Sequence, residues 1–250
     1  MFHATLDSSR IWKQIVDALA TLLTEAHFII KKDGISLIQY DSSRAAMVDL
    51  FLPSGIFQEY NCKGEHELSL GLDELGKVSK RMAGDDKLEF DLDESQNRFE
   101  IKMIGQAERT FKIQLLTPPG ERTQKISPTF EIRAEMFSDA FKQVVKDIGV
   151  VSNHMKITAT KDSLSFGGVG DVGEAETSLK LGDDSLLYDL EVKQDAVAMY
   201  ALSYLAEIAK AISSDSLTLR MTGNKPVMLE FPIAEGGMIS FLLAPRIERR

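Results

Sequence analysis

The sequence predicts an α+β protein of two tandem, similar domains, in which helices pack on one face of mainly antiparallel sheets. One observation is the segment 117–129 (TPPGERTQKISPT), whose three prolines and single glycine follow neither a helical nor a strand period. The other is that the flanking segments, residues 1–116 and 130–250, share one order of strands and helices. We therefore expect two domains with these bounds, joined by 117–129 as an exposed connector.

The first half begins with an alternating strand at 2–6, followed by helical spacing of apolar residues over 10–23. One of the residues 7–9 (DSS) can cap this helix. A second helix is expected over 73–82, where apolar residues again recur at helical spacing. Strands are expected over 27–31, 35–40, 46–52, 67–72, 87–92, 99–104 and 110–116.

The second half repeats this order. Residues 12–16 (WKQIV) align with 141–145 (FKQVV), and 33–37 (DGISL) align with 162–166 (DSLSF), both at an offset of 129. The opening strand is expected to recur at 130–133. The two helices are expected over 135–148 and 199–212. A match of helix and turn in one register indicates the tandem duplication of one α+β unit.

Composition indicates an ordinary soluble protein. The chain has 250 residues and a formal net charge of −9, which argues against a protein coated in basic patches. No apolar run reaches the roughly 18 residues of a membrane span, and the first residues lack the features of a signal peptide. The single cysteine, Cys62, cannot form an intramolecular disulfide. We expect a cytoplasmic protein, associated with the nucleoid if it acts on DNA.

Residue types that usually carry catalysis or bind metals are not grouped along the chain. The four histidines, His3, His27, His66 and His154, have neither an i,i+4 partner nor a nearby cysteine, so no zinc site is expected. Cys62 lies in no recognisable motif, and neither a nucleophile elbow nor a phosphate-binding loop occurs. We expect no enzyme activity and no cofactor.

One glycine pattern does fit a nucleotide-binding fingerprint. Residues 168–173 (GVGDVG) read G-x-G-x-x-G after a predicted strand. A dinucleotide site requires the third glycine to open a helix, whereas 174–181 ends in the alternation of a strand. A dinucleotide-dependent enzyme is therefore an alternative hypothesis, and the order of elements after the glycines decides it.

Cationic side chains on the predicted helices lie mostly off the apolar stripes, so they could share one outer surface. Solvated polar faces of ordinary helices would give the same pattern. The residues concerned are Lys13, Lys77, Lys80, Lys142, Lys146 and Lys210.

Four short motifs accompany the duplication. They are the opening Met1-Phe2, residues 40–44 (YDSSR), the pair Lys77 and Lys80, and residues 241–248 (FLLAPRIE) near the end. With these motifs the chain resembles DNA sliding clamps of the proliferating cell nuclear antigen (PCNA) family, most of all the archaeal members, over essentially its whole length. It departs from eukaryotic members at Leu242, where an aromatic residue is common, in its proline-rich connector, and in ending at Arg249-Arg250 without an acidic tail.

The resemblance implies a ring-forming homotrimer of six similar domains, with helices lining the hole and antiparallel sheets outside. A half of about 125 residues has a radius of gyration near 14 Å, so several such units are needed to surround duplex DNA. The implied function is a DNA polymerase processivity factor that encircles double-stranded DNA without sequence preference, in replication and repair. The implied partners are the replicative DNA polymerase, the clamp loader, flap endonuclease and DNA ligase, each binding through a short hydrophobic peptide motif.

The resemblance and the helix positions together assign three sets of residues. Expected to face DNA are Lys13, Lys77, Lys80, Arg81, Lys142, Lys146 and Lys210. Expected at a strand-to-strand subunit interface, between 110–115 and 174–181, are Thr110, Phe111, Ile113, Leu115, Ala175, Thr177 and Leu179. Expected to line the partner-peptide pocket are Tyr40, Asp41, Arg44, Met47, Ile126, Pro128, Pro226, Leu242, Ala244 and Pro245.

Several alternatives remain open at this point. Phe111, Met47 and Leu242 can be ordinary core residues, and Ile126 can pack beneath its own connector. The whole chain can also be a scaffold of duplicated domains that does not bind DNA, or a checkpoint-type clamp subunit that assembles only with unlike chains. The mass of the purified assembly separates a self-trimer from an obligate mixed ring.

Overall fold

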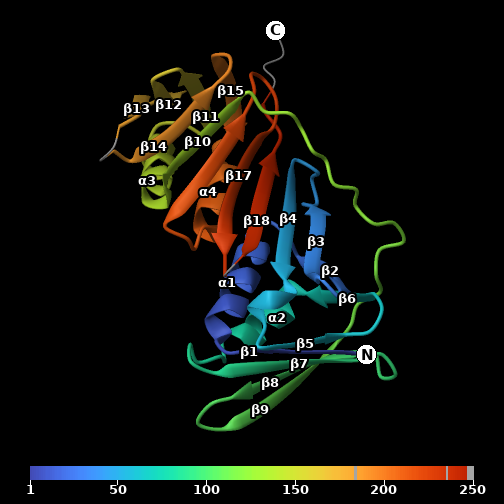
Figure 1. The fold of residues 1–250 in the computed structure, drawn as a ribbon. Helices are drawn as coiled ribbons and strands as arrows, with labels where there is room; N and C mark the ends of the chain where they lie inside the picture. Colours follow the sequence, from blue (N-terminus) through green and yellow to red (C-terminus); the bar gives the residue numbers. More distant parts are fainter. Residues whose placement is uncertain (183–184, 235, 247–250) are drawn as a thin grey trace. The chain divides into compact units, whose positions relative to one another are not determined.

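The computed structural model describes residues 1–182, 185–234 and 236–246 (Figure 1). Residues 247 and 248, which contributed to the resemblance, and the terminal Arg249-Arg250 lie outside the described residues. The chain forms two compact units. Unit 1 comprises Met1–Ser42, Val48–Lys125 and Pro232–Ile239. Unit 2 comprises Ser43–Met47, Ile126–Phe231 and the segment that begins at Ser240.

Unit 1 is built on antiparallel strands in two sheets (Figure 1). One sheet has the order β5-β1-β7-β8-β9, and in the other β3, β2 and β6 follow one another. The bounds are β1 (Phe2–Leu6), β2 (Glu25–Lys31), β3 (Gly34–Tyr40), β5 (Glu59–Cys62), β6 (His66–Gly71), β7 (Lys87–Asp93), β8 (Arg98–Ile104) and β9 (Glu108–Gln114). Three further strands, β4 (Ala46–Pro53), β17 (Val227–Ile233) and β18 (Gly237–Leu243), contribute residues to both units.

The helices of unit 1 are α1 (Ser9–Ala20), α2 (Leu72–Ser79) and a short 3₁₀ turn, η1 (Ser54–Ile56). Ser8 caps α1, because its side-chain oxygen accepts a hydrogen bond from the Arg10 amide at 3.3 Å. The expected extension of α1 to residue 23 was wrong. Thr21 donates its hydroxyl to the Ala18 carbonyl at 2.7 Å, and this competing bond accompanies the end of the helix.

The core of unit 1 is organised around Trp12 on α1. Its ring centroid lies 4.8 Å from that of Phe90, 6.0 Å from that of Phe28 and 6.4 Å from that of Phe99. These partners come from β2 in one sheet and from β7 and β8 in the other, so Trp12 joins the helix to both sheets. The Trp12 side chain is fully buried, and its indole N–H has no hydrogen-bond partner among the described residues.

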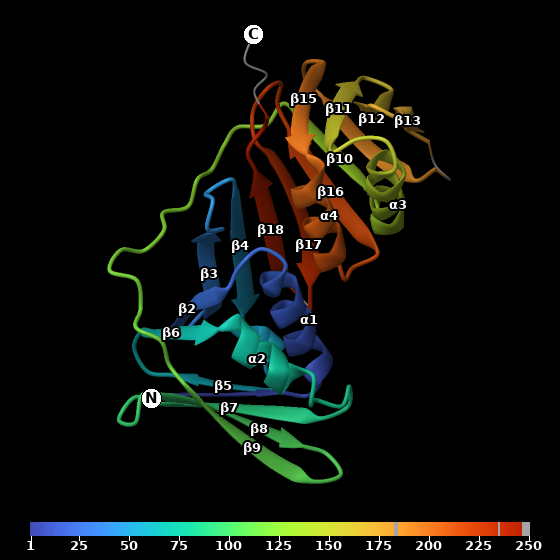
Figure 2. The same cartoon turned by 180° about the vertical axis from the view of Figure 1, so that it is seen from behind.

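Unit 2 repeats the same elements. One sheet has the order β13-β12-β11-β15, and β14, β10, β16 and β17 follow one another in the other. Figure 2 shows α3 and α4 beside one another on this unit. The bounds are β10 (Ile132–Phe137), α3 (Ser138–Gly149), β11 (His154–Thr160), β12 (Ser163–Gly170), β13 (Gly173–Lys180), β14 (Leu187–Val192), β15 (Ala196–Ala201), α4 (Leu202–Ala211), β16 (Ser216–Met221) and β17 (Val227–Ile233).

The duplication is confirmed element by element, since each α-helix and β-strand of the first half has a counterpart in the same order, whereas η1 has none among the described residues. Three details were wrong. The counterpart of β1 starts at Ile132 and not at Phe130, because its register is set by pairing Ile132 with Met221 on β16. Residues 135–137 belong to β10, and Met199 belongs to β15, so both helices of unit 2 begin later than expected. The short strand β5 was not expected at all.

A search of the described residues finds no helix that is both long and apolar enough to cross a membrane.

The Trp12 cluster gives the first prediction. Trp12→Ala is expected to lower the free energy of unfolding by about 3–5 kcal/mol, because a large buried ring is removed from a packed core. Trp12→Phe is expected to cost less, since a ring remains and the unpartnered N–H is removed; Phe141 occupies the matching position of α3. Denaturant unfolding followed by circular dichroism measures both, and equal losses for the two variants would contradict the assignment.

Candidate nucleic-acid and partner surfaces

Helix α1 separates a buried stripe from a polar one. Trp12, Ile15 and Leu19 are buried, so the residues between them face outward or sit at the margin. Lys13 is half-buried on that margin and Arg10 is exposed. Arg10 was not among the expected DNA-facing residues, although it lies three positions before Lys13 and therefore on a neighbouring part of the helix surface. That spacing was visible in the sequence.

The turn after α2 holds Lys80 and Arg81 in place. Both residues were expected inside the helix, but α2 ends at Ser79 and Lys80 is its C-cap. Asp86 is buried and accepts hydrogen bonds from the Ala83 amide at 2.9 Å and from Arg109 at 2.5 Å. Arg109 also donates to the Arg81 carbonyl at 2.8 Å. The turn is thus fixed by a buried carboxylate, which leaves the Lys80 and Arg81 side chains exposed.

Three of the expected DNA-facing lysines pair with a carboxylate on their own helix. Lys77 lies 3.0 Å from Asp73. The Asp73 hydrogen bond raises the pKa of Lys77. In the other helices, Lys142 lies 3.5 Å from Asp139 and Lys210 lies 2.6 Å from Glu207. These i,i+3 and i,i+4 pairs reduce the positive potential that each lysine presents to a phosphate.

The other expected cations have no carboxylate within ion-pair distance in the described part of the chain. They are Lys13, Lys80, Arg81 and Lys146. Three of the four belong to unit 1. The helix surface of unit 1 therefore carries more uncompensated positive charge than that of unit 2.

The two strands expected at a subunit interface are both edge strands. β9 is the last strand of the five-stranded sheet, and β13 is the last strand of the four-stranded sheet. Each leaves one row of backbone donors and acceptors unpaired within its sheet. β9 contains Thr110, Phe111 and Ile113, whereas Leu115 lies one residue beyond the end of the strand.

The residues expected at the interface differ in the burial of their side chains. Phe111 and Ile113 on β9 are partly exposed, and so are Ala175 and Thr177 on β13. Leu179 is only 7% exposed, so it already packs within its own unit. The two partly exposed apolar residues of β9 lie on one face of the strand, because their positions alternate.

The connector is tied to unit 1 by contacts from residue 116, just before it, to Lys125. The Leu116 amide donates to the Ser69 carbonyl of β6 at 2.9 Å. Arg122 lies 2.5 Å from Glu65 and also pairs with Glu67. Lys125 lies 2.7 Å from Asp49. These ion pairs join residues far apart in the sequence, so the periodicity of the sequence could not predict them.

The residues expected to line the partner-peptide pocket divide between the two units. Tyr40 and Asp41 belong to unit 1, and the others belong to unit 2. Within unit 2 the Ala244 amide donates to the Ala45 carbonyl at 2.9 Å, which joins the segment 43–47 to the C-terminal segment. The members of the set in unit 2 are Arg44, Met47, Ile126, Pro128, Pro226, Leu242, Ala244 and Pro245.

Burial within that set is uneven. Ile126 is 49% exposed, so it is a large apolar side chain on the surface of the connector. Met47 and Leu242 are 3% and 7% exposed, which leaves little of either side chain available to a ligand. Asp41 is buried, and Arg44 is exposed with a positive φ of 59°. Ile126 therefore presents an exposed apolar side chain two residues before Pro128.

The glycine pattern proves to be a β-hairpin and not a nucleotide loop. β12 and β13 pair antiparallel up to Gly170 and Gly173, and Gly173 opens a strand with a φ of +147°. No helix N-terminus stands behind the glycines to receive a pyrophosphate. The dinucleotide-enzyme hypothesis is therefore wrong.

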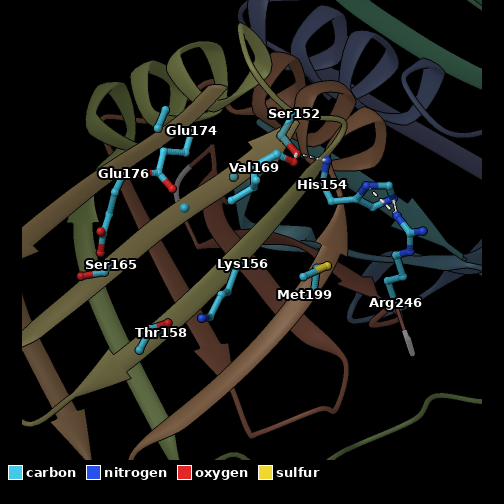
Figure 3. A pocket seen from close by; sticks show the side chains of 13 residues that line it. Ser152, His154, Lys156, Thr158, Ser165, Val169, Glu174, Glu176, Met199 and Arg246 are labelled. Atoms are coloured by element: carbon cyan, nitrogen blue, oxygen red, sulfur yellow. Dashed lines mark hydrogen bonds between the residues drawn. The ribbon is translucent and has the colours of Figure 1, made fainter. Parts of the chain in front are cut away.

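A polar hollow of about 710 Å³ lies over β11, β12 and β13 (Figure 3). In the described residues, its one histidine, His154, contacts Arg246 through its ring and has no carboxylate partner. Burial, and then the Arg246 charge, lower the pKa of His154. His154 therefore has no acidic partner to orient it as a general base among the described residues that line this hollow.

Metal and thiol chemistry find no support in the described residues either. No group of three or more His, Cys, Asp or Glu side chains is placed to bind a metal there. Burial raises the pKa of Cys62, and its thiol donates to the Gly64 carbonyl at 3.3 Å. A raised pKa lowers the fraction of Cys62 in the thiolate form, and the thiolate is the nucleophile, so the reactivity of this cysteine is reduced.

Comparison with known proteins identifies the family. The family model for the proliferating cell nuclear antigen N-terminal domain matches residues 1–116, and that for the C-terminal domain matches residues 125–246. The chain belongs to the proliferating cell nuclear antigen family.

Full-length relatives support this assignment. A protein of Thermofilum pendens named DNA polymerase sliding clamp is 40% identical, with 99% of this chain and all of that protein covered. A protein of the same name from Thermococcus sibiricus is 34% identical, with 99% of each chain covered. The crystal structure of PCNA from Thermococcus kodakaraensis matches with a TM-score of 0.92 at 28% identity, covering 98% of this chain and all of that one.

Proposed function

We propose that this chain is a DNA sliding clamp, a processivity factor that encircles duplex DNA and tethers a polymerase to it. The observation that carries the proposal is the match over the whole chain to relatives named DNA polymerase sliding clamp, on a duplicated fold of the same family. The clamp holds enzymes on DNA and catalyses no reaction of its own. It acts where the chromosome is, in the cytoplasm at the nucleoid.

The physical mechanism is topological. A closed ring stays on DNA without tight binding, so a few cations that contact phosphates are sufficient. Phosphate contacts carry no sequence information, which permits sliding. The net charge of −9 is compatible with this role, because acidic surfaces elsewhere keep nucleic acid from binding outside the ring.

The assembly we propose is a homotrimer closed by pairing β9 of one chain with β13 of the next. Support comes from the position of both strands at sheet edges and from the partly exposed Phe111 and Ile113 on β9. Pairing two edges in a closed ring satisfies backbone groups that would otherwise invite aggregation. A mixed ring of related chains is the alternative, and the mass of the purified assembly decides between the two.

The partners of the ring are the replicative DNA polymerase, the clamp loader, flap endonuclease and DNA ligase. We propose that they dock through a short peptide with a glutamine and clustered hydrophobic residues. The exposed Ile126 on the connector supports this site, together with the segment 43–47 that is hydrogen-bonded to Ala244. Prolines 128 and 245 restrict the backbone around the site and reduce the entropy lost on binding.

The inner-surface prediction compares the unpaired cations with the paired ones. The fourfold variant Lys13→Ala, Lys80→Ala, Arg81→Ala, Lys146→Ala is expected to lower clamp-stimulated DNA synthesis at moderate salt while the fold is unchanged. The threefold variant Lys77→Ala, Lys142→Ala, Lys210→Ala is expected to lower it less, because those lysines are partly neutralised by their own helices. Normal stimulation by the fourfold variant would show that this surface does not face DNA.

The interface prediction uses the edge strand directly. The Leu115 amide donates to the Asn97 carbonyl, so by the alternation of an antiparallel ladder the Ile113 amide bonds to β8 and the Lys112 amide faces the free edge. Lys112→Pro removes that outward-facing donor and is expected to give monomers with an intact fold. A control is Ile101→Val on the neighbouring strand β8, whose side chain is buried and whose backbone is already paired. Solution mass at several concentrations makes the measurement. A folded Lys112→Pro protein that keeps the trimer mass would contradict the assignment of β9.

The partner-site prediction concerns the connector. Ile126→Asp places a charge where an apolar anchor is expected to be buried, and Pro245→Ala loosens the C-terminal segment that is hydrogen-bonded to residues 43–47. Burial of one anchor contributes about 1.5–3 kcal/mol, so Ile126→Asp is expected to weaken peptide binding by about tenfold or more. Calorimetry with a motif peptide measures this. Binding that survives the charge at Ile126 would place the pocket elsewhere.

A further inference from the structure

The polar hollow of unit 2 has a floor without a side chain at its centre. The hollow measures about 710 Å³, and every residue that lines it belongs to unit 2. On this face of the sheet, Lys156 of β11 lies opposite Gly167 of β12, and Gly167 lies opposite Glu176 of β13. Because Gly167 carries no side chain, the row from Lys156 to Glu176 is open between its two ends (Figure 3).

Packing does not require a glycine at position 167. A Cβ atom at Gly168 would lie 2.6 Å from the Ile148 side chain, and one at Gly170 would collide with a backbone carbonyl of the preceding loop. At Gly167, the nearest atom to an added Cβ would be the Ala175 carbonyl oxygen at 3.7 Å, which is ordinary van der Waals contact. A glycine inside a strand weakens the strand and often marks a place where a ligand approaches the backbone. Gly167 therefore keeps the floor open for a reason that packing does not supply.

The duplication shows the same position in a filled form. At the offset of 129, Gly167 corresponds to Ile38 of β3, and the pairing registers of the two hairpins agree with this offset. Ile38 lines a cavity of about 190 Å³ together with Pro118 and Pro119, so the connector packs over this face of unit 1. No described residue of the connector lines the hollow of unit 2. The face that unit 1 fills and covers is thus left open by the described residues of unit 2.

Charged groups of opposite sign flank the open floor. Lys156 and Arg246 form one side of the hollow, and Glu174 and Glu176 form the other (Figure 3). Among the described residues, none of these four has a partner of opposite charge within ion-pair distance. Neighbouring strands lie about 4.8 Å apart, so the backbones of Lys156 and Glu176 are about 10 Å apart across β12. The hollow is therefore positive on one side and negative on the other.

Backbone and side-chain contacts hold Arg246 on the positive side. The Arg246 amide donates to the Met199 carbonyl at 2.7 Å. Its guanidinium lies 2.6 Å from Nδ1 of His154. Because a guanidinium can only donate, this ring nitrogen accepts and the imidazole is neutral, in agreement with the lowered pKa of His154. The positive side thus carries the charges of Lys156 and Arg246 and none from His154.

The hollow matches a ligand that carries charges of both signs. A ligand of one sign would be attracted by one side and repelled by the other, and the volume lies in the range of small-molecule sites. We propose that the hollow binds a small zwitterion, an ω-amino acid or a short free peptide, with its anionic group at Lys156 and Arg246 and its ammonium group at Glu174 and Glu176. The floor at Gly167 lets the ligand lie against the backbone of β12. Pairing β13 with a further strand would leave these side chains in the hollow, because they stand on the face of the sheet and not at its edge.

The test compares four linear probes of similar length on the intact protein by saturation-transfer NMR titration. The probes are 6-aminohexanoate, which is a zwitterion, adipate, which is a dianion, 1,6-diaminohexane, which is a dication, and hexanamide, which is neutral. The zwitterion is expected to bind about tenfold more tightly than each of the other three, because it alone gains a partner on both sides.

Substitutions at the floor and on the positive side locate the binding. Gly167→Ile introduces the residue of the matching position in unit 1, fills the floor and is expected to abolish saturable binding of 6-aminohexanoate. Its melting temperature is expected to equal or exceed that of the parent protein, since the added Cβ meets no close contact. The double variant Lys156→Ala, Arg246→Ala is expected to weaken binding about tenfold. The matched control Lys180→Ala removes an exposed cation of the same sheet that does not line the hollow and is expected to leave binding unchanged.

Each outcome supports the site or refutes it. Selective binding of the zwitterion that is lost in Gly167→Ile and kept in Lys180→Ala supports it. Equal binding of the four probes, equal binding of adipate and the zwitterion, or no saturable binding of any probe refutes it. Binding that survives Gly167→Ile places the probe outside the hollow and also refutes it. If Gly167→Ile does not fold, the double variant compared with Lys180→Ala decides, and equal affinities of those two proteins refute the site.

Discussion

Each helix of this chain can bury only one stripe of its surface, and the rest of the structure depends on that constraint. In unit 1, Trp12 fixes α1 against strands of both sheets. In unit 2, Phe141 is buried on α3, and its ring centroid lies 6.3 Å from that of Phe166 on β12. Charged residues of these helices therefore lie outside the buried stripe, on the side that faces away from the sheets. The position of the lysines and arginines on the helices is thus a consequence of apolar packing.

The charge on that surface is moderated by the helices that carry it. Lys77, Lys142 and Lys210 each have an acidic residue one turn away. A protein that must move along DNA gains nothing from tight phosphate contacts, because each contact has to be broken at every step. Partial neutralisation is therefore consistent with a surface that guides DNA without holding it. The fixed turn with Lys80 and Arg81 differs, since a buried carboxylate orients it and leaves those two cations unpaired.

The sequence allowed the order of elements to be predicted, because most of it follows from local periodicity. The helix α1, the turn before β3 and the hairpin that contains Gly173 all have a local signal. The strand β5 (EYNC) has none, since it exists through pairing with β1. The start of β10 also depends on a distant strand, which is why the expected register was shifted. Helix ends were missed where a side chain such as Thr21 competes for a backbone carbonyl.

The candidate surfaces could be predicted only in part. Cations at helical spacing indicated one face, and the i,i+3 and i,i+4 acids beside them were already visible in the sequence. The contacts of Arg109 with Asp86 and of Arg122 with Glu65 join distant segments, so no local pattern contains them. For the same reason, the burial of Leu179 within its own unit and the cavity beneath the connector emerged only from the fold.

The single tryptophan has a further consequence, which concerns spectroscopy. Trp12 is the one tryptophan of the sequence and lies deep in unit 1. Its emission therefore reports the packing of one repeat, whereas the other repeat contributes no tryptophan signal. Because the duplication places Phe141 at the same helix position, moving the indole there would shift the reporter to the second repeat. The internal repeat thus offers two optical views of one folding reaction, each restricted to a single unit.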